Sequence, residues 1–512
     1  MSKYRTIVGC LLFGSWEAFC PSARADRASE ISAQLRLFDR DPASFMWQVP
    51  LKWNSSGIKA APSSLGKFSN ARMAAKGRIR DQIASLSQHS PLLGRNSHLM
   101  IGATDHPESM VDQLVYRNLE QMASAHLQKA TLPSAPWSDT YWPTYDGSVA
   151  QRYADPAYPH SEDWQKNSDY LMAHVFDVQA DATSIDTLSP AEKYDLLAGD
   201  SNWTLTHAAL ADGKGYFDAS GSVETWMGIC HGWAAASYML PRPVHATVVT
   251  AADGHTKINF YPSDIKALAS LLWANSPGPT RFVGQRCEIK NPPTDPAGRI
   301  IDPGCFDTNP ATWHLSVVNQ IGASHRSMII DANYDYEVWN QPVYSYEYSF
   351  FNPQTQATAT DTAAASVKLS DFSQDKFHAY RSSATVTVIG VAMDVTYMSE
   401  TQPTHHTPDS ETDDSRMTVR YLYDLELNAQ GDIIGGEWYQ NTHPDFLWTA
   451  VKGAQASSMA DHDLDVSDPG ATWAGDMPMP ASWAKAVPSA SAHDQPLARV
   501  VNALITLSQS GI

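Results

Sequence analysis

The chain has 512 residues, of which 43% are hydrophobic, and it carries a formal net charge of −19. This length and composition predict a folded protein of about two to four domains. The acidic balance argues against a nucleic-acid partner and against anionic membrane surfaces, because both repel a negatively charged chain. Beyond the N-terminus, no segment is apolar for long enough to span a bilayer.

Residues 1–25 have the pattern of a secretory signal peptide. Lys3 and Arg5 supply the positive charge, an apolar run follows, and Ala23-Arg-Ala25 is a small-x-small cleavage site. We therefore expect a secreted or periplasmic protein that is cleaved near Ala25.

Residues 26–134 are predicted to form a helical N-terminal region. Apolar residues recur at helical spacing from Val111 to Met122, and residues 72–86 show a second, more basic amphipathic pattern. The region is interpreted either as helices that pack on the core or as a removable pro-segment over the active site.

The middle of the chain has three clear local signals. Residues 132–143 are rich in proline and aromatic residues, so we expect an extended segment whose tryptophans are buried. Ser189-Pro-Ala-Glu192 is a capping box with proline at the first helical position. Residues 263–274 have helical spacing and predict another helix.

Cys230 is predicted to begin a short helix that ends before Pro241 and Pro243. A thiol at a helix N-terminus is favoured as a thiolate, and the N–H groups there can form an oxyanion hole. We expect the N–H of Cys230 to contribute, with Trp226 and Gly228 as candidate oxyanion or substrate residues. The alternative is a structural cysteine that fills the core.

The cysteine count points to the same residue. Cleavage of the signal peptide would remove Cys10 and Cys20, and three cysteines in an exported chain suggest one disulfide and one thiol. Cys287 and Cys305 bracket a stretch rich in Pro and Gly that a bridge would pin, with a stabilisation of about 3 kcal/mol. Cys230 is then the free thiol.

A catalytic cysteine needs a base and a group that orients the base. Residues 312–319 and 326–331 are predicted as two strands of a tight hairpin. In the expected register His314 lies directly opposite Asp331 on the same face, with Cβ atoms about 5 Å apart.

The order and the register predict a triad of Cys230, His314 and Asp331. Asn333 and Asp335 are alternative third members that fall beyond the paired register. The alternative for His314 is a hydrogen-bonded histidine of the sheet. A helical cysteine followed by a strand histidine and then an acid is the order of papain-like enzymes and also of transglutaminases.

The last third of the chain is predicted to be β-rich. Residues 384–397 and 417–427 are rich in β-branched and aromatic residues, and a turn leads from the second into a hairpin strand at 432–439. The tail from residue 457 is polar and has little periodicity.

Val338-Trp-Asn-Gln-Pro-Val343 resembles the signature of the secreted transglutaminase elicitors of oomycete plant pathogens. The resemblance covers roughly residues 135–450. It also includes Pro136-Trp-Ser-Asp-Thr-Tyr-Trp-Pro143, Leu188-Ser-Pro-Ala-Glu-Lys-Tyr-Asp195, the Cys230 segment, Ser263-Asp-Ile-Lys-Ala-Leu268, Trp313-His314 and Gly435-Gly-Glu-Trp-Tyr439.

The resemblance implies a protein-glutamine γ-glutamyltransferase of the α+β class. Its papain-like catalytic core would span residues 135–352, followed by a β-rich C-terminal region at 353–512. Cys230, His314 and Asp331 would be nucleophile, base and orienting group. The partners would be protein substrates that supply a glutamine and a lysine or other amine, and residues 338–343 would form a recognition segment.

The recognition segment follows Asp331 closely, so its packing is expected to fix the catalytic geometry. Trp339 is predicted to be a large buried anchor, and Pro342 is predicted to stiffen the backbone just beyond it. The alternative is an exposed epitope or substrate-docking strip that has no part in folding.

The chemistry itself requires no cofactor, but the family resemblance implies calcium dependence. The acidic run Asp461-His-Asp-Leu-Asp-Val-Ser-Asp468 does not fit an EF-hand, because Val466 stands where the loop needs glycine. We interpret this run as a solvated acidic loop.

Two alternative functions remain open at this point. A papain-like cysteine protease or a protein glutaminase would use the same triad with water as the acceptor. A secreted recognition module, bound by a partner through residues 338–343, would be indifferent to a reagent that blocks Cys230.

Overall fold

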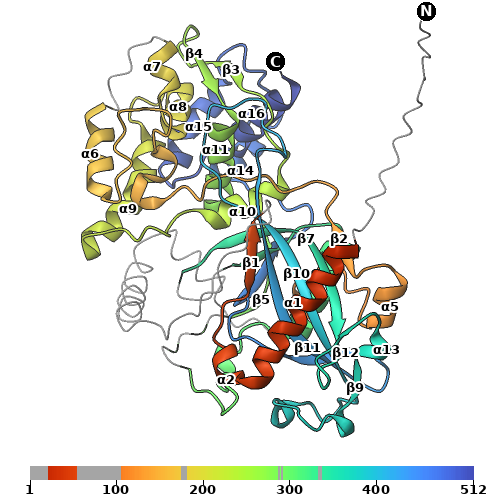
Figure 1. The fold of residues 1–512 in the computed structure, drawn as a ribbon. Helices are drawn as coiled ribbons and strands as arrows, with labels where there is room; N and C mark the ends of the chain where they lie inside the picture. Colours follow the sequence, from red (N-terminus) through yellow and green to blue (C-terminus); the bar gives the residue numbers. More distant parts are fainter. Residues whose placement is uncertain are drawn as a thin grey trace, which may run out of the picture.

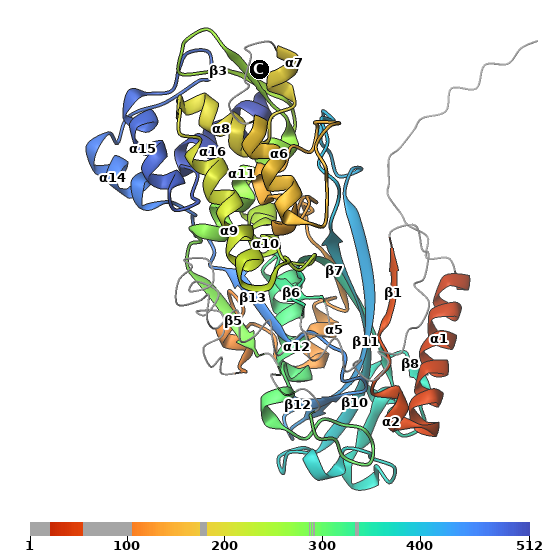
Figure 2. The same ribbon diagram turned by 90° about the vertical axis from the view of Figure 1, so that its left-hand side faces the viewer.

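The computed structural model describes residues 21–54, 105–174, 182–285, 287, 289, 292–332 and 337–511. These residues form a helical half and a half built on a large antiparallel sheet (Figures 1 and 2). The mixed architecture confirms the predicted α+β class. The chain termini of the described part lie in different halves, since α1 packs on the sheet and α16 belongs to the helices (Figure 2).

The sheet is antiparallel and draws its strands from distant parts of the sequence. Strands β10, β11 and β12 confirm the strands predicted after residue 353. Because β1 and β2 join the same sheet as β7 and β11, the three regions predicted from the sequence share one sheet. The main strand order is β1 (Leu51–Asn54), β11 (Ser415–Leu427), β10 (Thr387–Ser399), β7 (Asn340–Phe351), β6 (Ile329–Asp331), β13 (Phe446–Ala450) and β5 (Thr280–Gly284). Four shorter strands pair beside this path: β12 (Ile433–Trp438) with β11, β9 (Ser366–Lys368) with β10, and both β2 (Lys129–Thr131) and β8 (Thr358–Ala359) with β7.

Alternation along the central strands gives the sheet two buried faces. Val391, Met393 and Tyr421 contribute to a core on the side of α12 (Pro310–Val317). Ala392 and Leu422, one position away on the same strands, contribute to a core on the side of α1. This is the two-residue period of a strand, which sends successive side chains to opposite faces.

Helix α1 (Pro21–Arg40) closes the second face of the sheet, and the short α2 (Pro42–Phe45) follows it. Phe38 stacks on Tyr439 with 4.5 Å between ring centroids. Arg27 forms ion pairs with Glu347 of β7 and Asp394 of β10, each at 3.2 Å. These contacts show that α1 packs on the sheet, and the removal of residues 26–134 as a pro-segment stays a prediction. The predicted signal segment lies mostly outside the described residues and stays a prediction.

Replacing Phe38 by alanine tests whether α1 is part of the folded core. Phe38 is buried against three aromatic rings, so we expect Phe38→Ala to lower the free energy of unfolding by about 3 kcal/mol. Leu37→Ala is the matched control, because Leu37 is 39% exposed on the same helix and should cost less than about 1 kcal/mol. Urea titration measures both, and equal small effects would mean that α1 is dispensable.

The helical half gathers around α11 (Pro262–Asn275), which confirms the helix predicted over 263–274. The predicted capping box at Ser189 begins α8 and is also confirmed. The predicted polar tail is wrong, because α16 buries an apolar face against α11. The other helices of this half are α6 (Trp164–His174), α7 (Ala182–Asp186), α8 (Pro190–Ala198), α9 (Thr204–Ser220), α10 (Cys230–Met239), α14 (Met459–Ser467), α15 (Ala481–Ser491) and α16 (Ala498–Ser510). A two-stranded hairpin of β3 (Thr247–Thr250) and β4 (Lys257–Phe260) belongs to the same half.

The N-terminal helical prediction holds only in part. Between Val111 and Met122 the chain is helical only from Leu119, where α5 (Leu119–Ser124) begins with Asn118 as its cap. A short 3-10 turn (Pro107–Ser109) precedes this segment. The amphipathic pattern at 72–86 lies outside the described residues. Within the described part of the chain, no helix is long and apolar enough to cross a membrane.

Candidate active site

Cys230 is the first residue of α10, as predicted, and α10 lies where the two halves meet (Figure 1). Two glycines allow this position. A Cβ on Gly232 would lie 2.1 Å from the carbonyl oxygen of Ser270, so only glycine lets α11 approach so closely. A Cβ on Gly228 would lie 2.4 Å from the carbonyl oxygen of Tyr141. Both glycines therefore serve close packing around the helix start.

The sulfur of Cys230 lies against the start of β7. Its thiol donates to the carbonyl oxygen of Val338 at 3.6 Å, and Nδ2 of Asn340 donates to the sulfur at 3.5 Å. Oδ1 of Asn340 accepts from Nε1 of Trp448 at 2.8 Å. Cys230 is only 5% exposed. The segment predicted for recognition thus contacts the predicted nucleophile directly.

Asp331 is held beside the same segment. It is the last residue of β6 and pairs with Asn340 of β7. The N–H of Trp339 donates to Oδ1 of Asp331 at 3.0 Å. The half-buried indole of Trp339 donates to Glu337 at 2.8 Å and meets the ring of Tyr141 edge-on. The segment after Asp331 therefore fixes the position of this carboxylate.

Most of the predicted recognition segment is an interior strand. Residues 340–343 are buried at the start of β7, where Pro342 pairs with Ile329 of β6. Pro342 thus continues the sheet beside the site, as a stiff backbone would, although it has no N–H to donate to a neighbouring strand. This burial disagrees with an exposed recognition strip over the whole segment. Val338 and Trp339, both half-buried, are its more accessible part, so the anchor predicted at Trp339 is only partly covered.

The charged groups that act on the thiol are carboxylates. Burial raises the pKa of Cys230 to about 11, the hydrogen bonds from Asn340 oppose this rise, and the charges of Glu400 and Asp331 add to it. Glu400 follows β10 and accepts a hydrogen bond from the side chain of Gln341. In this arrangement Cys230 is a protonated thiol at neutral pH.

The predicted hairpin around His314 is wrong. Residues 310–317 form α12, and a π-helical turn (Val318–Ala323) follows it. The signal for a helix was present, because Asn309 caps the first turn and Pro310 occupies its first position. Only residues 329–331 of the second predicted strand are extended, and β6 pairs with β7 and β13 instead.

His314 consequently does not meet Asp331 or Cys230 in the described contacts. Its Nδ1 is 2.8 Å from the hydroxyl of Tyr423, and its ring meets Tyr348 edge-on, in the core between α12 and the sheet. Burial lowers the pKa of His314 to about 3, so the ring is neutral at physiological pH. Cys230 belongs to the core of the helical half. The papain-like core stays a prediction, without the strand histidine expected at 314.

The other site residues predicted from the sequence have different outcomes in the structure. Cys287 and Cys305 form the expected disulfide, and Cys230 is the free cysteine of the described chain. Trp226 packs into a separate cluster with Trp164. The alternative third members of the triad, at 333 and 335, lie outside the described residues.

Metal-binding residues do not cluster in the described part of the chain. No group of three or more His, Cys, Asp or Glu side chains there could hold a metal ion. The prediction of a loop for the acidic run at 461–468 is wrong, because this run forms most of α14. Asp461 caps that helix, and Asp465 pairs with Arg499. These carboxylates already have partners within the fold.

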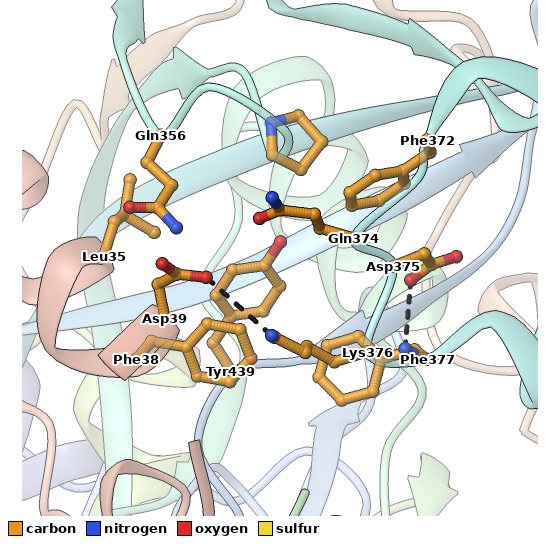
Figure 3. Close-up of a pocket in the computed structure, with 11 residues that line it drawn as sticks. Leu35, Phe38, Asp39, Gln356, Phe372, Gln374, Asp375, Lys376, Phe377 and Tyr439 are labelled. Carbon is orange, nitrogen blue, oxygen red and sulfur yellow. Dashed lines mark hydrogen bonds and ion pairs between the residues drawn. The ribbon is translucent and has the colours of Figure 1, made fainter. Parts of the chain in front are cut away.

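A separate pocket lies between α1 and the loop at 372–377, away from Cys230 (Figure 3). Phe38, Phe377 and Tyr439 supply its aromatic wall, and Lys376 reaches across it to Asp39 at 3.8 Å. It has no cysteine or histidine among its lining residues. The pocket therefore offers no thiol or imidazole of its own.

Three residues of the site were missed by sequence reasoning. Trp448 lies in β13 and Glu400 directly follows β10, both distant in sequence from Cys230, and no local motif marks either of them. Asn340 lay within the predicted recognition segment, but its contact with the sulfur depends on its pairing with Asp331. Predicting this contact would have required knowing that β6 pairs with β7.

The family model described as "Transglutaminase elicitor" matches residues 109–468. No curated protein matches the chain. Among solved structures, the chain is similar to the crystal structure of the GP42 transglutaminase from Phytophthora sojae, with 21% identity and a TM-score of 0.44. That similarity covers 65% of this chain and 85% of the other.

Proposed function

Because the chain belongs to the transglutaminase elicitor family, we propose that it is a protein-glutamine γ-glutamyltransferase that acts through Cys230. One observation supports this most. The free cysteine begins a helix and lies against residues 338–340, the segment that also holds Asp331.

In the first half of the reaction, the sulfur of Cys230 attacks the side-chain carboxamide carbon of a substrate glutamine. A carbon–sulfur bond forms, the carbon–nitrogen bond breaks, and the thiol proton leaves with the nitrogen as ammonia. In the second half, an unprotonated lysine amine attacks the thioester. The isopeptide bond forms, the carbon–sulfur bond breaks, and a proton from the amine returns to the sulfur.

We propose that Asp331, and not His314, carries the proton between these groups. The charge of Asp331 acts on the thiol, and the N–H of Trp339 holds Oδ1 of the carboxylate in place. His314 lies in a different core, where its ring forms a hydrogen bond with the hydroxyl of Tyr423. A positioned carboxylate is an accepted general base, although a histidine is more frequent.

The first turn of α10 supplies the natural oxyanion site. The N–H groups of Gly232 and Trp233 bond the carbonyl oxygen of Ile229. The N–H of Cys230 precedes them, at the end of the helix where the dipole is positive. We propose that it donates to the oxyanion of each tetrahedral intermediate.

The proposed partners are exported proteins that present glutamine and lysine side chains. The disulfide between Cys287 and Cys305 supports a location outside the cytosol, where such bonds persist. Calcium is an expectation from the family resemblance, and no step above uses it.

The test is incubation of the protein with a glutamine peptide and a labelled primary amine, followed by mass spectrometry. We expect the amine to appear on the glutamine side chain and ammonia to be released. Glutamate without amine incorporation would instead establish a glutaminase, and a cleaved peptide would establish a protease. An unchanged peptide would contradict all three reactions and favour a recognition module.

A further inference from the structure

The side-chain amide of Asn340 connects the sulfur of Cys230 to Trp448. Nδ2 of Asn340 lies 3.5 Å from the sulfur, and Oδ1 lies 2.8 Å from Nε1 of Trp448. Asn340 is 5% exposed and Trp448 is 4% exposed, so water does not compete freely for either bond. The amide is therefore a buried link between two distant strands and the helix start.

The indole determines which way the amide faces. An indole nitrogen only donates, so it must meet the oxygen of the Asn340 side chain. The nitrogen of the amide must then face Cys230. The two ends of an amide look alike in most structures, but here the chemistry of Trp448 fixes the choice.

An N–H directed at sulfur matters most when the sulfur is ionised. A neutral thiol is a weak acceptor, whereas a hydrogen bond to an anion is about twice as strong as a neutral one. The backbone of Asn340 also forms a hydrogen bond with Cys230, so this residue supplies two favourable contacts. The carbonyl oxygen of Val338, in contrast, suits only the protonated thiol.

We propose that Asn340 is a catalytic residue that donates to the ionised sulfur of Cys230, and that Trp448 is the positioning residue that holds its amide in that orientation. The inference rests on the proposed function in that it takes this sulfur as the nucleophile. When the thiol loses its proton, the contact with Val338 weakens and the contacts from Asn340 strengthen. The same donors face the sulfur again when it leaves the thioester.

The experiment measures the sulfur directly. The folded protein is treated with iodoacetamide at fixed pH, and alkylation of Cys230 is followed by mass spectrometry in wild type, Asn340→Ala, Trp448→Phe and the double variant. We expect Asn340→Ala to slow alkylation about tenfold, the size of one charge-assisted hydrogen bond, and Trp448→Phe to slow it several-fold. Because Trp448 acts through Asn340, the double variant should be no slower than Asn340→Ala.

Trp438→Phe is the matched control, because this buried tryptophan also loses an Nε1 bond, to the carbonyl oxygen of Thr308 at 2.7 Å. It should leave alkylation unchanged. The inference would be overturned if Cys230 were alkylated as fast in Asn340→Ala as in wild type. It would also be overturned if the rate reductions of Asn340→Ala and Trp448→Phe multiplied in the double variant. Amine incorporation is assayed in parallel. A wild type without transfer would defeat the proposed function and leave the alkylation result to decide the inference.

Discussion

Cys230→Ala is expected to abolish amine incorporation, with a loss of at least about 10³-fold, because Cys230 is the free cysteine of the described residues and the thioester needs a thiol. The same variant should keep its fold. Cys230 is a small side chain at a helix start, and its removal takes away only the contacts of one sulfur with Val338 and Asn340. Transfer of a labelled amine and thermal unfolding measure the two expectations separately.

Cys287→Ser with Cys305→Ser is the control for Cys230→Ala. It removes the two sulfurs of the disulfide and leaves Cys230 in place, so it should lose stability and keep turnover at low temperature. Full amine incorporation by Cys230→Ala would show that the nucleophile has been assigned to the wrong residue.

Asp331→Asn should change two measurements in opposite directions. Neutralising this carboxylate removes a charge that raises the pKa of Cys230, so more thiolate is present and alkylation becomes faster. Amine incorporation should nevertheless fall about 10²-fold, because the group that carries the proton is lost. An asparagine oxygen can still accept from Trp339, so the fold should survive.

Glu400→Gln is the matched variant for this prediction. Glu400 also raises the pKa of Cys230, and its bond from Gln341 can be kept by a glutamine oxygen. We expect faster alkylation with amine incorporation retained. If Glu400→Gln lost turnover and Asp331→Asn did not, the proton would be carried by Glu400.

The sequence was a good guide wherever a local signal decides the structure. The start of α10 at Cys230, the capping box at Ser189 and the disulfide between Cys287 and Cys305 each depend on residues close in sequence or on a count. The hairpin of β11 and β12 was predicted for the same reason, because its turn lies between adjacent strands.

The error at His314 shows where such reasoning stops. Residues 312–319 include β-branched and aromatic side chains that suit a strand, but Asn309 and Pro310 set a helix before them. Asp331 then finds its partner in β7, and the hairpin register that joined it to His314 does not exist. Pairing between strands is decided by the packing of the whole sheet, so Trp448 and Glu400 could not be predicted.

The position of Pro342 was also decided by strand pairing. A proline in a segment of six residues suggests a loop or an exposed edge, because it cannot donate to a sheet. The structure instead places Pro342 opposite Ile329, inside β7. The pairing with β6, which the sequence does not identify, buries residues 340–343 and places them beside Cys230, against the alternative of an exposed strip.

The burial of Cys230 has a consequence for how long the protein lasts. Disulfide exchange and oxidation both begin with a thiolate that reagents can reach. With its pKa raised to about 11 and 5% exposure, Cys230 is a protonated and covered thiol at pH 7. The disulfide between Cys287 and Cys305 fits an oxidising environment, in which an exposed thiolate would be attacked. The covered thiol of Cys230 is therefore expected to resist oxidation and disulfide exchange.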